Sequence, residues 1–500
     1  MVLFDVSDPL HIRPGVVLRM RFLRFTSLLT NGVIGFLCVT AAADSPAQAP
    51  AKTAESALST ASTESTAPKS GAQTSEAAIV PGDETQTDEI VEPDLSALQP
   101  SNAAQVRLER ARSSVLQIRG FYHDAQSSAF HGSGFAVTAD GLIVTNYHVV
   151  SEAVVYPQQY RLEYLTGDGR TGKLLVYAID LTNDLAIVKA DDLQLPPLRL
   201  RTAIPRLGER AYAIGFPLNL GLTITEGVAN GLVENGFEQR IHYTGAINGG
   251  MSGGPALDAG GLVYGVNVSV ITARQLVGFV VPAKHIEPLL LRARKPLIES
   301  STPREARNLV AAQVLAQQAK IYISMSEKFA TQTILGYTLP TQLAPSMECN
   351  TIGNPADNPQ VHIETVRCKL QARLLVQRGL EVGDITLQHK VMNSATLHPL
   401  QFSRQVNREV DSYSRSGSVA FVAPFACEDA LVSLDGFDAR VTTCARQYRL
   451  FANLYDIAVT AVSINHARQA AISRLDLRGV AFEPGMQLVR RYLGAMKWKP

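Results

Sequence analysis

The chain has 500 residues and a formal net charge of +1, because 46 Lys and Arg residues are balanced by 45 Asp and Glu residues. This length predicts two or three domains, each with enough chain for a hydrophobic core. The basic residues are spread along the sequence, no glycine-rich phosphate loop is followed by Lys, and no Cys/His cluster has zinc spacing. We therefore expect no nucleic acid partner, no cofactor and no metal.

The first 43 residues have the organisation of a secretory signal peptide. A basic head at Met20–Arg24 precedes a mostly apolar stretch, Phe25–Thr40, and Ala41–Ala43 supplies a small-residue cleavage site. Because residues 1–18 carry acidic residues and prolines, Met20 is a candidate for the true start. An uncleaved membrane anchor is the alternative, although the stretch is barely long enough to span a bilayer and includes several polar residues.

Residues 44–103 contain no aromatic residue and consist mainly of Ala, Ser, Thr, Pro, Gln and acidic residues. Such a segment cannot bury enough apolar surface to fold. We expect a disordered linker whose end-to-end distance, as a flexible coil, is on the order of 45 Å.

A β-hairpin is predicted next, over residues 134–145. Two short apolar strands, Gly134–Val137 and Leu142–Thr145, are joined by a turn that contains Asp-Gly, a strong hairpin signal. His148 follows directly, where a rigid sheet can hold an imidazole ring. It is our candidate general base.

Two carboxylates near the start of the next β-prone segment are candidates to orient that imidazole. Asp184 immediately precedes the segment and Asp180 lies four residues earlier. A buried carboxylate that accepts from one ring nitrogen fixes the tautomer and stabilises the imidazolium. We favour Asp184, while Asp180 is expected to cap the turn.

Asn248–Pro255 places one serine, Ser252, in a run of glycines. Glycine at position 250 lets the backbone N–H groups of Gly250 and Ser252 point into one small hole, where they can stabilise an oxygen anion. This arrangement suits acyl transfer with Ser252 as nucleophile. An anion-binding nest or a plain turn are the alternatives for the octet taken alone.

Taken together, these segments resemble the trypsin-like serine proteases, and within them the HtrA (Deg) type of bacterial envelope protease. The resemblance covers about residues 105–297 in the order His, Asp, Ser. It implies that His148, Asp184 and Ser252 are a catalytic triad and that the amides of Gly250 and Ser252 form the oxyanion hole. The matching blocks are Gly132–Val150, Asn183–Val188, Ala213–Pro217, Ala246–Pro255, Gly261–Ser269 and Gly278–Pro282.

The chain departs from the HtrA pattern in its serine loop. Met251 stands where the family usually has Asn, and Gly249 where it usually has Arg. Met251 cannot pair with a newly cut N-terminal ammonium group, so activation by propeptide cleavage is not expected. Gly249 adds flexibility, which leaves open a resting state with a collapsed oxyanion hole that substrate or a partner orders.

The resemblance also places a specificity pocket at Ile247, Val270 and Ile271, with no carboxylate to attract Lys or Arg. We expect cleavage after small or medium aliphatic residues. The alternative is that these three side chains fill the core of the second barrel.

The predicted fold is mostly β. Residues 104–297 contain many short strands separated by turn residues, as in a chymotrypsin-like double antiparallel β-barrel. The catalytic residues are expected at the cleft between the barrels, where an extended peptide binds along a strand edge.

Residues 298–500 are expected to form a separate α+β domain of unknown type. A capping box at Thr302 starts a helix predicted over about 303–334, and β-rich sequence follows. Trp498 and its basic neighbours are expected to be a mobile tail. The predicted strands include Val361–Val366, Ser418–Val422 and Ala458–Ser463.

Four cysteines remain after removal of the signal, which contains Cys38, and all four lie in this region. They allow three disulfide connectivities. Proximity in the sequence favours Cys349–Cys368 and Cys427–Cys444. Four reduced thiols in a cytosolic protein are the alternative.

These observations predict a periplasmic or secreted serine endopeptidase that acts on peptides or unfolded proteins, with a role in envelope protein quality control. The rival hypothesis is a catalytically silent binding protein or chaperone that keeps the protease fold and acts through its C-terminal domain. HtrA relatives are often trimers and carry PDZ domains, so the resemblance leaves a homo-oligomer open. The carboxylate-binding loop of a PDZ domain is not found after residue 298. An envelope partner for this region is a hypothesis.

Overall fold

The computed structural model describes residues 102–499, except 218–219, 234–237, 269–277, 298–301, 354–359, 371, 412–419 and 465. The predicted signal peptide and linker therefore lie outside the described residues, apart from the end of the linker, where helix α1 (Asn102–Arg112) begins. None of the helices in the described part of the chain combines the length and the apolar composition that a membrane span requires.

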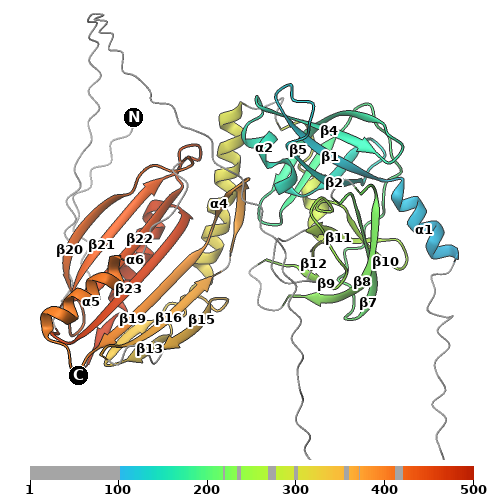
Figure 1. Cartoon of the computed structure of the whole chain (residues 1–500). Coiled ribbons are helices and arrows are strands. Elements are labelled where there is room, and N and C mark those ends of the chain that lie inside the picture. The colour runs from blue at the N-terminus through green and yellow to red at the C-terminus, as the bar shows by residue number, and fades with distance from the viewer. Residues whose placement is uncertain are drawn as a thin grey trace, which may run out of the picture. The chain divides into compact units, whose positions relative to one another are not determined.

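The first closed barrel has the strand order β1-β2-β3-β6-β5-β4 (Figure 1). The predicted hairpin is confirmed, because β2 pairs with β3 and Gly141 has the positive φ, 90°, that its turn requires. Apolar side chains fill this barrel. Its strands are β1 (Val115–Tyr122), β2 (Phe130–Ala136), β3 (Leu142–Thr145), β4 (Tyr160–Thr166), β5 (Thr171–Asp180) and β6 (Leu185–Lys189).

The second closed barrel has the order β10-β11-β12-β9-β8-β7, so the predicted chymotrypsin-like double barrel is confirmed. Besides α1, the described helices of this part of the chain are α2 (Tyr147–Val155), which follows β3, and η2 (Ala283–His285) and α3 (Ile286–Leu290), which follow β12. The strands are β7 (Glu209–Gly215), β8 (Thr223–Leu232), β9 (Ile241–Tyr243), β10 (Pro255–Asp258), β11 (Val263–Val268) and β12 (Gly278–Pro282).

The C-terminal region begins with helix α4 (Pro303–Ser324) and contains a seven-stranded antiparallel sheet with the order β15-β16-β19-β23-β22-β21-β20. Both predicted disulfides are present, and each joins an edge strand to its neighbour in register. The sheet strands are β15 (Glu348–Gly353), β16 (His362–Leu370), β19 (Ile385–Asn393), β20 (Ala426–Ser433), β21 (Asp438–Gln447), β22 (Tyr455–Ser463) and β23 (Gln469–Val480).

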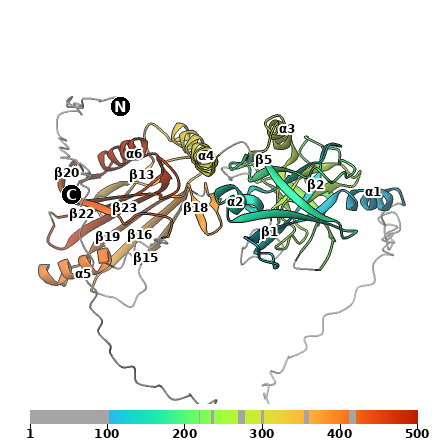
Figure 2. The ribbon, with the colours of Figure 1, turned by 90° about the horizontal axis from the view of Figure 1, so that it is seen from above.

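Two helices cover opposite faces of this sheet (Figure 2). Helix α5 (Pro399–Asp411) buries Phe402 against Met392 of β19, whereas α6 (Phe482–Gly494) stacks Tyr492 on His389 of the same strand. Successive side chains of a strand point to opposite faces, so residues 389 and 392 mark the two sides. A separate hairpin consists of β17 (Leu374–Gln377) and β18 (Leu380–Val382).

The structure differs from the sequence prediction in the length of the first C-terminal helix. The capping box at Thr302 is present, but α4 ends at Ser324 instead of near Ile334. Met325 at its end has the extended dihedrals φ −70° and ψ 132°. Residues 331–334 form strand β13 (Thr331–Ile334), since β-branched side chains favour a pleated surface when a partner strand is available.

The prediction that Trp498 and its neighbours form a mobile tail is also wrong. Strand β24 (Lys497–Trp498) pairs with β14 (Tyr337–Pro340), and the indole of Trp498 lies 4.1 Å from the His466 ring, measured between centroids. Burial of the aromatic surface against these rings offsets the entropy of ordering a chain end.

Of the predicted strand Ser418–Val422, the first two residues lie outside the described residues. Val422 makes only an isolated bridge with Tyr448.

Candidate active site

His148 lies in the first turn of α2, directly after the barrel strand β3. Every other residue of this helix is buried, so α2 is enclosed by neighbouring elements rather than exposed at the surface. The His148 side chain keeps 27% of its surface exposed. An imidazole in this position is held by a rigid element and still reaches solvent.

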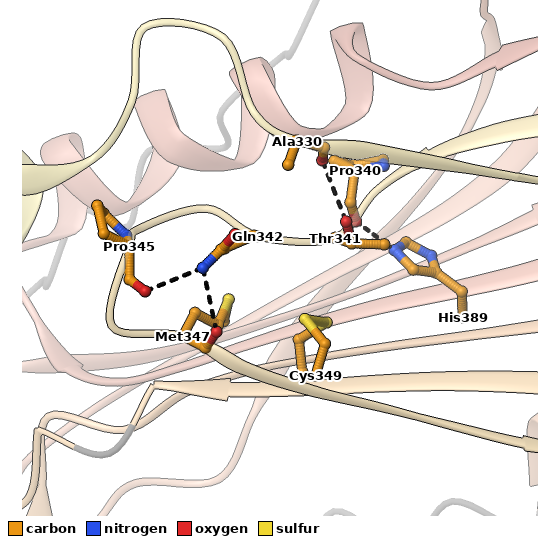
Figure 3. The surroundings of a disulfide bond; sticks show 9 residues. Ala330, Pro340, Thr341, Gln342, Pro345, Met347, Cys349 and His389 are labelled. Atoms are coloured by element: carbon orange, nitrogen blue, oxygen red, sulfur yellow. Dashed lines mark hydrogen bonds between the residues drawn. A yellow bond between two sulfur atoms is a disulfide. The ribbon is translucent and has the colours of Figure 1, made fainter. Parts of the chain in front are cut away.

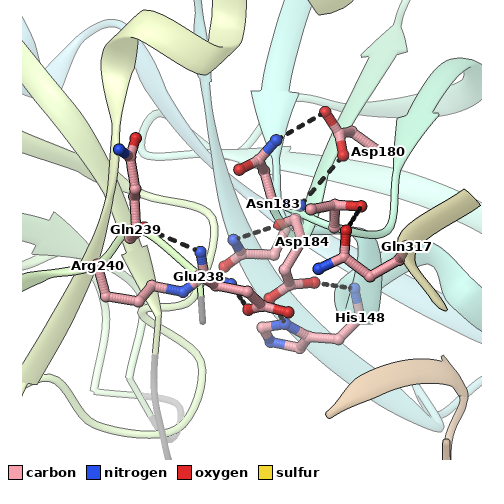
Figure 4. A network of polar contacts seen from close by, with 10 residues as sticks. His148, Asp180, Asn183, Asp184, Glu238, Gln239, Arg240 and Gln317 are labelled. Atoms are coloured by element: carbon pink, nitrogen blue, oxygen red, sulfur yellow. Dashed lines mark hydrogen bonds and ion pairs between the residues drawn. The ribbon is translucent and has the colours of Figure 1, made fainter. Parts of the chain in front are cut away.

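Asp184 contacts His148 through both of its carboxylate oxygens (Figure 4). Nδ1 of the His148 ring lies 2.7 Å from Oδ2, and the backbone N–H of His148 donates to Oδ1 at 2.9 Å. Asp184 has a φ of 56°, a left-handed conformation that Asp tolerates better than most residues. The two contacts fix both the position and the rotation of the ring.

The rival carboxylate, Asp180, has a different task. It accepts hydrogen bonds from the backbone and side-chain nitrogens of Asn183, at 3.1 and 3.0 Å, and pairs with Arg292 at 3.4 Å. Asp180 therefore closes the turn, and Asp184 is the carboxylate that contacts the imidazole.

The electrostatics of the pair favour a basic imidazole. Burial by itself lowers the pKa of His148, but the charge of Asp184 and the hydrogen bond to it outweigh burial, so the pKa is raised above its ordinary value. Nδ1–H donates to the carboxylate, which leaves the other ring nitrogen as the acceptor when the ring is neutral. The pair can therefore accept a proton and stabilise the resulting cation.

Glu238 is a further carboxyl group near this pair that sequence reasoning did not identify. It lies between β8 and β9 and pairs with Arg240 at 2.7 Å. Burial, opposed by Arg240 and assisted by the negative charges of Asp184 and Asp180, raises the pKa of Glu238 to about 7. Only the fold brings it here, because no sequence motif surrounds it.

Ser252 lies in the loop before β10 and is 4% exposed. Its backbone carbonyl accepts a hydrogen bond from the N–H of Ser133 at 2.7 Å. The next residue, Gly253, approaches the His148 segment so closely that a methyl group on it would lie 3.1 Å from the backbone nitrogen of Asn146. The fold thus brings the serine loop beside the turn that holds His148.

The glycine at position 250 is required by the loop itself. Its φ is 97°, and a Cβ there would lie 2.4 Å from the carbonyl oxygen of Phe216. Ser133 fixes the same residue, because its hydroxyl donates to the Gly250 carbonyl at 2.7 Å and accepts from the Phe216 N–H at 2.9 Å. Ser133 was missed by sequence reasoning, although it stands in the Gly-Ser-Gly of β2. Gly249, in contrast, has no atom within 4 Å of an added Cβ.

Of the three predicted pocket residues, Val270 and Ile271 lie outside the described residues. Ile247 is half-buried and packs against the second-barrel cluster that contains Tyr243 and Met251. Its Cδ1 would be 3.0 Å from a Cβ added to Gly278. Within the described ranges, no group of three or more His, Cys, Asp or Glu side chains is arranged to hold a metal ion.

Two closed six-stranded barrels, with a His–Asp pair from the first and a glycine-rich serine loop from the second, define the chymotrypsin-like class of fold. Residues 132–266 match the trypsin-like peptidase domain family. This part of the chain is therefore similar to a trypsin-like peptidase domain in both sequence and fold.

Its relatives are proteases of the HtrA type. A probable periplasmic serine endoprotease DegP-like protein of Chlamydia trachomatis serovar D is 34% identical over 167 residues, which are 32% of each chain. The mitochondrial serine protease HTRA2 of Drosophila willistoni is 37% identical over 175 residues, or 33% of this chain and 39% of the relative. The chain thus spans about a third of the length of these curated relatives.

A solved structure of the serine endoprotease from Yersinia pestis is similar as well. It is 26% identical in sequence, with 39% of this chain and 67% of that chain covered and a TM-score of 0.34.

Proposed function

We propose that this protein is a serine endopeptidase in which Ser252, His148 and Asp184 act as nucleophile, general base and orienting carboxylate. The proposal rests on one observation: two hydrogen bonds join His148 to the Asp184 carboxylate, one from the backbone and one from the ring. A histidine in a structural role has no need of a carboxylate that fixes its tautomer while its ring stays partly exposed.

In the proposed reaction, His148 takes the proton of the Ser252 hydroxyl as its oxygen attacks the scissile carbonyl carbon. The N–H groups of Gly250 and Ser252 stabilise the oxyanion of the tetrahedral intermediate. The C–N bond then breaks, and the amine leaves with the proton from His148. Water hydrolyses the acyl-enzyme by the same steps, which releases the acid and restores the hydroxyl.

The proposed substrates are peptides or unfolded proteins that bind as extended strands and are cleaved after small or medium aliphatic residues. Ile247, an apolar side chain next to the serine loop, supports this preference. A peptide library cleaved mainly after Lys or Arg would refute it.

We also propose that the protein is exported to the periplasm or beyond the cell, where it acts in envelope protein quality control. The two disulfides support this location, because such bonds persist in oxidising compartments. The periplasmic description of the Chlamydia relative points the same way. Sequencing the N-terminus of the mature protein tests the predicted cleavage near Ala43.

Covalent labelling by a fluorophosphonate tests the catalytic proposal directly. We expect the wild-type protein to be labelled on Ser252 and Ser252→Ala to remain unlabelled. The labelling is repeated with a peptide present, because substrate can order a collapsed oxyanion hole. Absence of labelling in both conditions, with unfolded clients still bound, would instead support a catalytically silent chaperone.

A further inference from the structure

The first helix of the C-terminal region contacts the loop that ends at Asp184. The side-chain amide of Gln313 accepts from the N–H of Leu181 at 2.9 Å and donates to the carbonyl of Ile179 at 3.1 Å. One turn further along α4, Gln317 accepts from the hydroxyl of Thr182 at 3.3 Å (Figure 4). Gln317 is 2% exposed. Helix α4 thus contacts three of the five residues before Asp184.

The β17–β18 hairpin contacts the helix that carries His148. The hydroxyl of Tyr147, the neighbour of His148, donates to the carbonyl of Val376 at 2.6 Å. One turn along α2, the Glu152 carboxylate accepts from the backbone N–H of Arg378 at 2.7 Å. Helix α4 contributes to the same support, because Arg307 donates to the carbonyl of Val155, the last residue of α2, at 2.9 Å.

Apolar packing joins these elements. Val310 and Val314 of α4 and Val376 of the hairpin are buried in the same hydrophobic cluster as Val154 of α2 and Leu181 of the Asp184 loop. The polar contacts lie beside this cluster and are at least partly buried, and a hydrogen bond in such surroundings is stronger than one at the surface.

We propose that helix α4 and the β17–β18 hairpin form a brace for the His148–Asp184 pair, in which Gln313 and Gln317 position Asp184 and the hairpin positions α2. This inference rests on the proposed function. It assigns a task to the region that follows the barrels: the site depends on side chains more than 120 positions later in the chain.

Asp184 needs such support because of its backbone. A residue other than glycine at a φ of 56° stays there only when its surroundings determine the conformation. The backbone carbonyl of Asp184 is already held by the Asn146 side chain at 2.8 Å, and Gln313 and Gln317 hold the preceding residues. Loss of Gln313 frees two backbone groups, so the carboxylate moves relative to the imidazole. A displacement of about 1 Å near a catalytic group can cost roughly 100-fold in rate.

The test compares Gln313→Met with Asn308→Met, a matched change at an exposed residue of the same helix. Fluorophosphonate labelling rate, kcat and KM are measured on the full chain. The Nδ1 proton of His148 is followed by NMR in protein labelled with ¹⁵N-histidine. We expect Gln313→Met to lower kcat and the labelling rate about 10- to 100-fold with KM nearly unchanged.

The NMR signature separates positioning from a merely structural role. A proton in a short, charge-assisted hydrogen bond resonates far downfield, and we expect this signal to shift upfield or vanish in Gln313→Met but not in Asn308→Met. We also expect the pKa of His148 to be lower in Gln313→Met than in the wild-type protein. Asp180 and Glu238, two other carboxyl groups near the His148–Asp184 pair, are the same in both proteins. A folded Gln313→Met protein with the wild-type proton signal and wild-type rates would overturn the brace.

Two further measurements keep the test decisive. If Gln313→Met does not fold, Gln313→Glu replaces it, since Glu keeps the acceptor for Leu181 but loses the donor to Ile179. Wild-type rates and signal in that variant would again overturn the inference. If the wild-type protein is not labelled at all, the proposed function fails, whereas the NMR comparison in a Ser252→Ala background still tests the brace.

Discussion

Two histidines of this chain show what separates the proposed catalytic arrangement from a structural one. His148 binds the Asp184 carboxylate through Nδ1 and keeps a quarter of its side chain exposed. His389 lies in the C-terminal sheet, and its Nδ1 is 2.9 Å from the hydroxyl oxygen of Ser473. Its Nε2 donates to the carbonyl of Pro340 at 2.6 Å (Figure 3). It is fully buried.

The difference lies in which protonation state the surroundings favour. Burial lowers the pKa of His389 to about 4, against a weaker opposite effect of Pro340, so the ring is neutral and both nitrogens are occupied. Asp184 raises the pKa of His148. A serine beside a histidine is therefore not by itself a catalytic pair. The histidine also needs a carboxylate partner and a ring that is partly exposed.

The largest expected effect is the loss of the Ser252 hydroxyl. Ser252→Ala should lower kcat by a factor on the order of 10⁵–10⁶, as expected for removal of a serine nucleophile. Ser473→Ala, which removes the hydroxyl beside His389, should leave kcat within about twofold. Hydrolysis of a fluorogenic peptide measures both. Equal losses in the two variants would break the distinction between the two histidines.

Removal of the Asp184 charge is expected to have the second-largest effect on activity. Asp184→Asn should lower kcat/KM about 10⁴-fold near neutral pH, because an amide can hold the imidazole in the wrong tautomer. In the proposed mechanism the neutral form of His148 is the active one, so kcat/KM should rise with pH through a pKa above the ordinary value of about 6.5. An acid limb below pH 6 would contradict the electrostatics of the pair.

His389 should instead govern stability. Its native pKa of about 4 lies below the unfolded value of about 6.5, so its contribution is complete above pH 6.5 and is lost as pH falls toward 4. At 1.36 kcal/mol per unit, that loss is about 3 kcal/mol. Urea unfolding at several pH values, followed by the fluorescence of Trp498, the single Trp of the chain, measures this loss of stability.

His389→Leu provides the control for this prediction. The variant cannot bind the proton, so its stability should depend less on pH between 7 and 4.5. At pH 7 it should be less stable than wild type by about 1–3 kcal/mol, because Ser473 and Pro340 lose a buried partner. Identical pH dependence in the two proteins would refute the role of His389.

The smallest effect concerns Glu238. As this carboxyl group ionises, its charge repels that of Asp184 and favours a protonated His148. Glu238→Gln removes the charge, and the acid limb of kcat/KM should therefore move to lower pH by a few tenths of a unit. Glu226→Gln, at an exposed residue of β8 in the same barrel, is the control. A shift to higher pH would contradict the proposed coupling.

The sequence predicted those features of the fold that depend on local chemistry. The Asp-Gly turn specified the β2–β3 hairpin, the alternation of short strands and turns specified the barrels, and Thr302 with Glu305 specified the start of α4. Both disulfides join cysteines fewer than 20 positions apart, so proximity was enough to pair them. The residues proposed as catalytic were identified from short motifs around each of them.

Tertiary contacts decided the rest. Residues 331–334 and Trp498 became strands because β14 lies between them and pairs with both, more than 150 positions apart in the chain. The contacts of Gln313, Tyr147 and Glu238 with the surroundings of the His148–Asp184 pair likewise join distant segments. A local pattern records a residue's own preferences, whereas its partner across the fold depends on the packing of the whole chain.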